Sequence, residues 1–78
     1  MQDLLDVVAK ALVNNPAAVE VNKVERDSSV VLELKVAPED MGKVIGKQGR
    51  IARAIRTVIR AAAAKDSRRV MVEIVEHS

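Results

Sequence analysis

Near the middle of the 78-residue chain runs the sequence Val44-Ile45-Gly46-Lys47-Gln48-Gly49-Arg50-Ile51. Its two glycines stand three positions apart. A glycine backbone has no Cβ atom, so it can approach another polymer closely and can adopt φ/ψ values that other residues avoid. Lys47 lies between the glycines, and Arg50 adds a planar donor fork at the expected start of the next helix, where free N–H groups also attract anions. The sequence therefore predicts a loop that contacts phosphate groups.

Hydrophobic periodicity on either side of this loop predicts three helices and three strands. Helical spacing covers residues 3–13 and 50–64, and a short helix is expected to open at 37–40 and to be stopped by Gly46. Alternation predicts strands at residues 18–26, 30–36 and 68–75. The alternation slips at Lys23-Val24, which indicates a bulge or an exposed strand end.

The expected fold class is α+β, in the order α-β-β-α-α-β. The first two strands should pair as an antiparallel hairpin in a three-stranded mixed sheet, with three helices packed on one face. Adjacent Glu39 and Asp40 are expected to stabilise a helix N-terminus, because neighbours on a helix do not face each other as an acid/base pair would. The side chains expected to turn inward from the two later helices are Met41, Val44, Ile45, Ile51, Ile55, Val58, Ile59 and Ala62.

Charge is distributed unevenly along the chain, although the formal net charge is only +2. Residues 41–60 contain six basic and no acidic residues, whereas the rest contains seven basic and eleven acidic residues. Arg53, Arg56 and Arg60 lie almost opposite the apolar arc of the longest helix. This segregation predicts one basic face of the kind that binds nucleic acid. A solvated arginine-rich helix face is the plainer interpretation, but the arginines directly follow the glycine loop, which favours binding.

The residue types that are absent exclude several functions. With no aromatic residue, bases cannot stack on Phe, Tyr or Trp platforms as they do in RRM and OB domains. With no cysteine there is neither a disulfide nor a thiolate metal site, which suits a reducing cytoplasm, and the chain has no membrane-spanning run or signal peptide. The single histidine, His77, is expected to be solvated. No catalytic residue, metal or cofactor is predicted.

A nucleotide-binding P-loop is also excluded. Gly42 and Gly46 have three residues between them instead of four, and Gln48 follows Lys47 where a P-loop has Ser or Thr.

The residues Ile45-Gly46-Lys47-Gln48-Gly49-Arg50-Ile51 resemble the I-G-x-x-G-x-x-I signature of KH domains, whose GxxG loop clamps four nucleotides. The closing isoleucine falls one position early, at Ile51, with Ala52 in its slot. The order of elements is similar to that of a type II KH domain. It covers residues 1–78 as one domain with the core motif at 46–49. The chain thus resembles the KhpA family of small bacterial single-domain KH proteins.

The resemblance implies non-catalytic binding of single-stranded RNA, with broad specificity, by a chaperone-like or post-transcriptional regulator in the bacterial cytoplasm. It also implies a homodimer and a heteromer with a larger KH-containing RNA-binding protein. The expected RNA-binding residues are Lys43, Ile45, Gly46, Lys47, Gln48, Gly49, Arg50 and Arg53. The apolar groove for bases should be bordered by Ile45, Ile51 and part of Val44 or Met71. DNA remains an alternative ligand, because no residue can be assigned to reading a 2′-hydroxyl.

A protein-interaction module is the second hypothesis. In it Gly46 is only a helix C-cap, and Gly49 only part of a turn between helices. Residues 61–64, four alanines, offer a small-residue end that another helix could approach, or are simply good helix formers.

Overall fold

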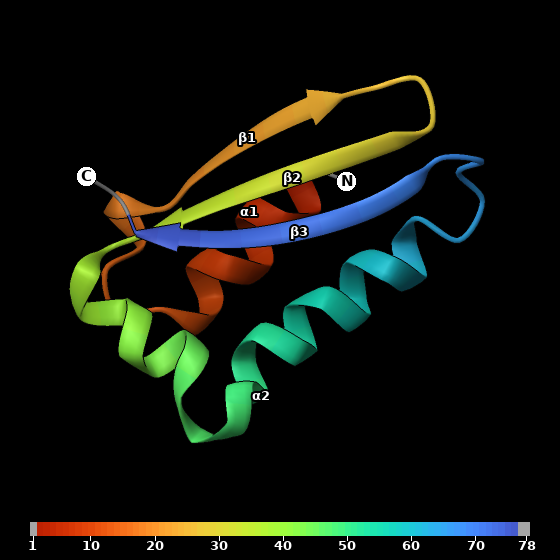
Figure 1. Cartoon of the computed structure of the whole chain (residues 1–78). Helices are drawn as coiled ribbons and strands as arrows, with labels where there is room; N and C mark the ends of the chain where they lie inside the picture. Colours follow the sequence, from red (N-terminus) through yellow and green to blue (C-terminus); the bar gives the residue numbers. More distant parts are fainter. Residues whose placement is uncertain (1, 77–78) are drawn as a thin grey trace.

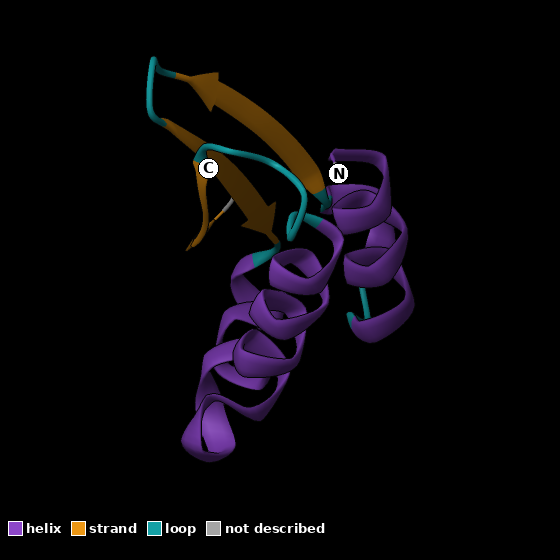
Figure 2. Cartoon of the chain, turned by 90° about the vertical axis from the view of Figure 1, so that its right-hand side faces the viewer, coloured by secondary structure: helices purple, strands orange, loops and turns teal. Residues whose placement is uncertain are grey.

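The three-stranded sheet is covered on one face by helices (Figures 1 and 2). The computed structural model describes residues 2–76 except the side chain of Lys47; His77 lies outside the described residues. The elements are α1 (Gln2–Leu12), a 3₁₀ turn η1 (Pro16–Ala18), β1 (Glu20–Glu25), β2 (Ser29–Val36), α2 (Pro38–Ala62) and β3 (Arg69–Glu76). None of the helices among residues 2–76 is long and apolar enough to span a membrane.

The central strand β2 organises the sheet, whose order is β1-β2-β3. It pairs antiparallel with β1 and parallel with β3, so the predicted hairpin and mixed sheet are confirmed. Alternate residues of β2 are fully buried toward the helices, because successive side chains of a strand point to opposite faces. These residues are Val30, Leu32, Leu34 and Val36.

The first strand is shorter than predicted because η1 occupies residues 16–18. Its pairing with β2 runs without interruption from Glu20↔Lys35 to Glu25↔Val30. Every residue of β1 except Val21 is exposed. The slip in alternation at Lys23-Val24 therefore reflects an exposed strand end and not a bulge.

Helix α2 consists of two arms that meet at a sharp bend (Figure 1). The bend lies at Gln48 and Gly49, whose φ angles are 64° and 68°. Together with α1, the two arms supply the three helices of the predicted order, and the α+β fold class is confirmed. The prediction that Gly46 stops the first arm is wrong, because the helix continues past it and the left-handed residues come two positions later.

The fully buried core residues come from every main element except β1, whose Val21 is partly buried against them. The second arm does not face the core quite as predicted, since the buried residues are Ala52, Ile55 and Ile59, whereas Val58 is 39% exposed. The buried face of the second arm is therefore rotated by part of a helical turn from the predicted apolar face, toward Ala52. The fully or nearly buried apolar side chains from the other elements are Leu5 and Ala9 of α1, Val13, Val44 of the first arm, the inward residues of β2, and Val72 of β3.

Asp40 has a structural role that its place in the first helical turn did not reveal. Its carboxylate is fully buried and accepts hydrogen bonds from the backbone N–H groups of Asn14 and Asn15, each at 3.0 Å. Lys43 Nζ also donates to Asn14 Oδ1 at 3.2 Å. These bonds attach the chain after α1 to the start of α2. The assignment of Asp40 to the helix dipole alone was therefore incomplete.

Candidate nucleic-acid interface

The bend of α2 holds a non-glycine residue in the left-handed region. For Gln48 this conformation costs about 1 kcal/mol, because the Cβ atom crowds the following carbonyl. Arg53 Nη2 donates to Gln48 O at 3.2 Å and helps to hold the turn. A strained backbone of this kind is concentrated at functional sites in proteins.

At Gly46, in contrast, the backbone conformation does not require a special residue. It lies within the helical arm, has no positive φ, and a Cβ atom built on it would meet nothing within 4 Å. Glycine inside a helix is destabilising by about 0.5–1 kcal/mol relative to alanine. The same holds for Gly42. Packing within this chain therefore does not require glycine at either position. Only Gly49, at a φ of 68°, is required by the backbone conformation.

A cleft of about 300 Å³ opens beside the bend. Four of the residues predicted to bind RNA line it together: Ile45, Gln48, Gly49 and Arg53. Ile45 is 51% exposed, so the expectation that it packs inward from the first arm is wrong, whereas its expected place at the border of an apolar groove fits this cleft. The cleft thus combines a backbone bend, an aliphatic wall and a guanidinium.

The other predicted site residues lie outside the lining of this cleft. Lys43 is exposed and bonded to Asn14. Gly46 lies one residue after the cleft-lining Ile45, and the side chain of Lys47 lies outside the described part of the structure. Arg50 is exposed, and among residues 2–76 its guanidinium has no hydrogen-bond or ion-pair partner.

Sequence reasoning missed five residues of the cleft: Ala52, Arg56, Thr57, Arg60 and Ile74. Arg56 and Arg60 are not among the expected RNA-binding residues, although both belong to the predicted basic face. They reach the cleft because residues three and four apart share a helix face, which continues the row from Gly49 through Arg53. Ile74 comes from β3. The only sequence signal for its position was its alternation with Glu73 and Val75, which predicts a strand but not a contact with the cleft.

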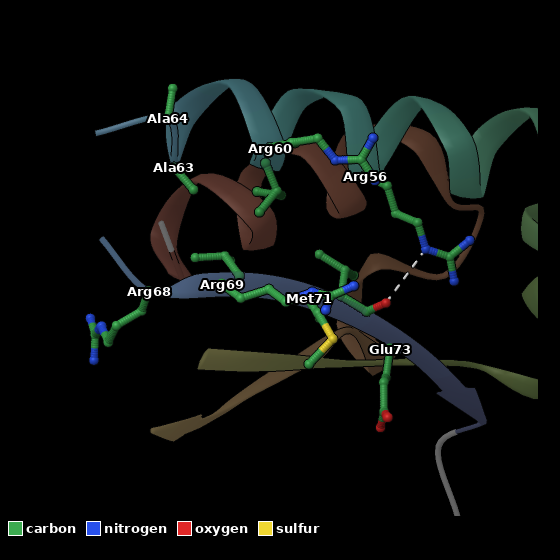
Figure 3. Close-up of a pocket in the computed structure, with 11 residues that line it drawn as sticks. Arg56, Arg60, Ala63, Ala64, Arg68, Arg69, Met71 and Glu73 are labelled. Atoms are coloured by element: carbon green, nitrogen blue, oxygen red, sulfur yellow. Dashed lines mark hydrogen bonds between the residues drawn. The ribbon is translucent and has the colours of Figure 1, made fainter. Parts of the chain in front are cut away.

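The aliphatic residues expected to border the groove are placed differently from one another. Val44 is fully buried, and Ile51 is partly buried against the core. Met71 lines a separate groove of about 620 Å³ between the second arm of α2 and β3 (Figure 3). Of the predicted border, only Ile45 lines the cleft at the bend.

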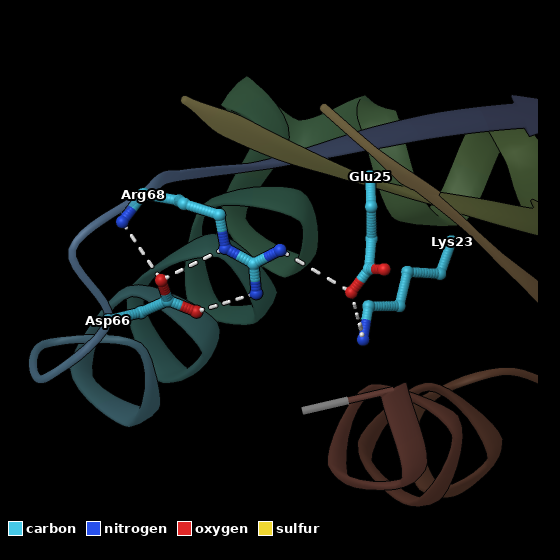
Figure 4. Close-up of polar contacts among 4 residues, drawn as sticks. All are labelled: Lys23, Glu25, Asp66 and Arg68. Atoms are coloured by element: carbon cyan, nitrogen blue, oxygen red, sulfur yellow. Dashed lines mark hydrogen bonds and ion pairs between the residues drawn. The ribbon is translucent and has the colours of Figure 1, made fainter. Parts of the chain in front are cut away.

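An ion-pair network ties the turn before β3 to the end of β1 (Figure 4). Arg68 binds Asp66 Oδ1 through Nε at 3.2 Å and Glu25 Oε1 through Nη1 at 3.4 Å, and Lys23 Nζ lies 2.9 Å from the same Glu25 oxygen. Lys23 and then Arg68 lower the pKa of Glu25, and Arg68 lowers the pKa of Asp66. Asp66 in turn raises the pKa of Arg68. The positive charge of Arg68 is therefore neutralised within the domain.

Comparison with known proteins identifies the family. The family model described as "KhpA/KhpB, KH domain" matches residues 2–74. The chain belongs to this family. Proteins named RNA-binding protein KhpA from Caldanaerobacter subterraneus subsp. tengcongensis and Clostridium acetobutylicum are each 64% identical to it over 75 residues, which cover 96% of this chain and 100% of theirs. No solved structure shows a significant match.

More distant KhpA relatives also match over nearly their whole length. RNA-binding protein KhpA from Aquifex aeolicus is 49% identical over 76 residues, 97% of this chain and 96% of its own. The KhpA/KhpB KH domain is a non-enzymatic family of bacterial proteins, so the predictions of the family and of a non-catalytic role are confirmed.

Proposed function

We propose that this chain binds single-stranded RNA, without catalysis, through the loop at residues 46–49 and the cleft beside it. The observation that carries the proposal is the bend itself. Packing within the chain does not require glycine at Gly46, which directly follows Ile45. Ile45 is part of the aliphatic wall of the cleft, and arginines lie at the border of that cleft. The printed names of the KhpA relatives as RNA-binding proteins support the same ligand.

In the proposed mechanism the loop backbone approaches the sugar-phosphate chain. Gly46 leaves room for it, and the positive φ values of Gln48 and Gly49 turn the chain sharply at this point. Lys47 and Gln48 donate to phosphate oxygens, and Arg50 and Arg53 extend the positive track along the second arm. Lys43 adds positive charge on the first arm.

Bases pack against aliphatic side chains in this mechanism. Ile45, Ala52 and Ile74 form the apolar part of the cleft, and the chain has no aromatic residue on which a base could stack. Van der Waals contact of this kind discriminates weakly between bases. We therefore expect broad specificity, in keeping with an RNA chaperone or post-transcriptional regulator that acts in the cytoplasm as one KH domain spanning residues 1–78.

The test is fluorescence anisotropy of labelled single-stranded RNA with the native protein and with the double variant Lys47→Asp, Gln48→Asp. With about four phosphates engaged, native binding should show a log–log salt slope of roughly −3, and the double variant should lose binding while keeping its circular dichroism spectrum. The control is Lys10→Asp, Asn22→Asp, which changes net charge equally on α1 and β1 and should keep binding. Equal affinities of native protein and folded loop variant would exclude the loop as the clamp. Parallel titration with DNA of the same sequence determines which nucleic acid binds better.

Self-association is a second proposed function, favoured by apolar side chains on the helix surface. Val7 is 65% exposed, and Leu4 and Val58 are also exposed. A domain of this size buries only about 60% of its unfolded surface, so covering such residues would stabilise it. A homodimer, or a heteromer with a larger KH-containing RNA-binding protein, would provide this cover. Sedimentation equilibrium of native protein and Val7→Glu tests it; a monomeric native protein would contradict the homodimer.

A further inference from the structure

The outer face of the sheet, turned away from the helices, carries a row of apolar side chains. Among residues 2–76 no helix covers this face (Figures 1 and 2). The row has one member from each strand, because Val24 lies opposite Val31 and Val31 lies opposite Met71. Val24 is 41% exposed and Met71 is 39% exposed. Isolated apolar residues are normal on a protein surface, whereas a row that is continuous across the sheet indicates contact with another molecule.

Two carboxylates occupy the next row of the outer face. Glu33 and Glu73 lie opposite each other on β2 and β3, and Glu73 points away from the second arm of α2 in Figure 3. Neither side chain has a hydrogen-bond or ion-pair partner among residues 2–76. Like charges directly opposite on neighbouring strands destabilise a sheet, so the fold gains nothing from this pair. A cation from outside the domain would relieve the repulsion.

The cations of the outer face lie in other rows. Lys35 lies opposite Glu20, one row beyond Glu33, and Arg69 lies opposite Ser29 on the far side of the apolar row. Neither cation stands opposite one of the two unpaired carboxylates. The position in front of the carboxylate pair is therefore available to a cation of a ligand that also covers the apolar row.

The charge of this face excludes several occupants. The cleft and the groove adjoin on the helix side, where Arg56 and Arg60 line both, and Met71 and Glu73 border that groove only because β3 is an edge strand. Carboxylates repel phosphate, so neither a nucleic-acid strand nor an anionic lipid surface suits the outer face. A second copy of this chain would have to offer its basic residues 41–60, which carry the proposed nucleic-acid interface.

We propose that the outer face of the sheet binds an amphipathic segment of a different protein. Apolar side chains of the partner cover Val24, Val31 and Met71, and its lysine or arginine side chains pair with Glu33 and Glu73. Methionine suits such a surface because its unbranched, polarizable side chain adapts to the shape of a partner. The partner supplies a second layer against the sheet, on a surface distinct from the helix surface proposed for self-association.

The experiment titrates the isotope-labelled full chain with a short amphipathic peptide of leucine and lysine and follows the backbone amides by NMR. The titration contains no nucleic acid, because the peptide itself would bind it. The largest shift changes should fall on Val24, Val31, Glu33 and Glu73, and a matched peptide of leucine and glutamate should leave these amides unchanged. Changes centred on α1 or α2 would overturn the inference. Shifts of the outer-face amides with protein concentration alone would also overturn it, because a second copy would then be the occupant.

Two double variants separate the charges from the apolar contact. Glu33→Gln, Glu73→Gln should weaken peptide binding about tenfold, because two exposed ion pairs are lost. Val24→Thr, Val31→Thr keeps the β-branched shape that suits a strand and should weaken binding by a similar factor, because two buried methyl groups become hydroxyls. Circular dichroism checks that each variant is folded. Equal affinities of the native protein and both folded variants would contradict the proposed contacts.

The matched control is Asp3→Asn, Asp27→Asn, which removes two carboxylates from α1 and from the turn after β1 and should retain peptide binding. If the control loses as much affinity as Glu33→Gln, Glu73→Gln, the attraction is long-range electrostatics and the inference is overturned. Thermal unfolding gives an independent readout, since loss of the like-charge pair should raise the Tm. A lower Tm would show that the two carboxylates serve the fold and not a partner.

Discussion

The ion-pair network and the basic surface of this domain use their charged side chains in different ways. In the network, Arg68 is bonded to Asp66 and Glu25, so its charge serves to attach the turn before β3 to β1. Around the bend and the groove, Arg50, Arg60 and Arg69 have no such partner among residues 2–76. This difference shows that a nucleic-acid-binding surface is identified by its unpaired cations and not by its number of arginines. A guanidinium that is already paired has few N–H donors free for a phosphate.

The same contrast separates residues that hold the fold from residues that face a ligand. Asp40, Asp66 and Arg68 make bonds within the chain, whereas Gly46 and Arg60 make none that the fold requires. If the contrast is correct, changes to the first group should alter stability and leave RNA binding intact. Changes to the second group should do the reverse.

The largest expected effect on stability comes from Asp40→Ala. It leaves the N–H groups of Asn14 and Asn15 without their carboxylate acceptor and should lower the free energy of unfolding by about 3 kcal/mol. Urea denaturation followed by circular dichroism measures the change. Asp40→Asn keeps one acceptor oxygen and should cost less. RNA affinity of the folded protein should not change; a loss of affinity in a variant that is still folded would place Asp40 in both groups.

The three glycines of α2 test, within one helix, the distinction between residues that hold the fold and residues that face a ligand. Gly49→Ala should lower the free energy of unfolding by about 1 kcal/mol, because alanine is strained at a φ of 68°. Gly46→Ala should raise it by about 0.5–1 kcal/mol, because its Cβ meets open space in a helix, yet it should weaken RNA binding. Gly42→Ala is the control, with the same gain in stability and unchanged binding. Identical affinities for the Gly42 and Gly46 variants would show that no ligand approaches Gly46.

The variant Arg68→Gln tests whether an arginine that is already paired within the domain contributes to RNA binding. Its partners are partly exposed, so the loss of stability should be smaller than that of Gly49→Ala, and its RNA affinity should equal that of the native protein. Arg53→Gln removes the same charge from the cleft together with the exposed hydrogen bond to Gln48 O, so it should weaken RNA binding and lower stability only slightly. Calorimetry of both variants, with and without RNA, provides the comparison. Equal losses of affinity would show that Arg68 also faces the ligand.

The smallest expected effect is on the pH dependence of stability. The pKa values of Glu25 and Asp66 are lowered from 4.5 and 3.8, so these carboxylates bind fewer protons when folded and stabilise the protein at neutral pH. That contribution should be lost as pH falls below about 4 through the lowered pKa values. The Tm measured from pH 7 to pH 2 should fall less in Arg68→Gln than in native protein. Parallel curves would show that the network contributes nothing to acid stability.

The helices and strands could be predicted because their signals are local. Strand β2 alternates so regularly that its prediction was within one residue of Ser29–Val36, and α2 begins at Pro38, within the predicted range 37–40. The bend was predicted at the right loop but assigned to the wrong glycine. Sequence alone favours Gly46 as the stop, since nothing local reveals that Gln48 takes a left-handed φ.

The candidate site was only half visible in the sequence. Ile45, Gln48, Gly49 and Arg53 were recognised because they lie within or next to the motif. Ile74 was missed because it reaches the cleft only through the parallel pairing of β3 with β2, in which it lies opposite Leu34. That pairing joins residues 40 positions apart and leaves no periodic signal near the loop.

The sequence by itself determined the order of elements, the basic stretch at residues 41–60, the glycine loop and the family, because each depends on spacing between near neighbours. Only the tertiary structure decided which cations are available, which face of α2 is buried and how the cleft and groove adjoin. Those features depend on the rotation of a helix against a sheet and on side chains that meet from distant segments. Arg68 and Arg69 are adjacent in sequence and line the same groove, yet one is bonded to two carboxylates and the other guanidinium has no partner among residues 2–76.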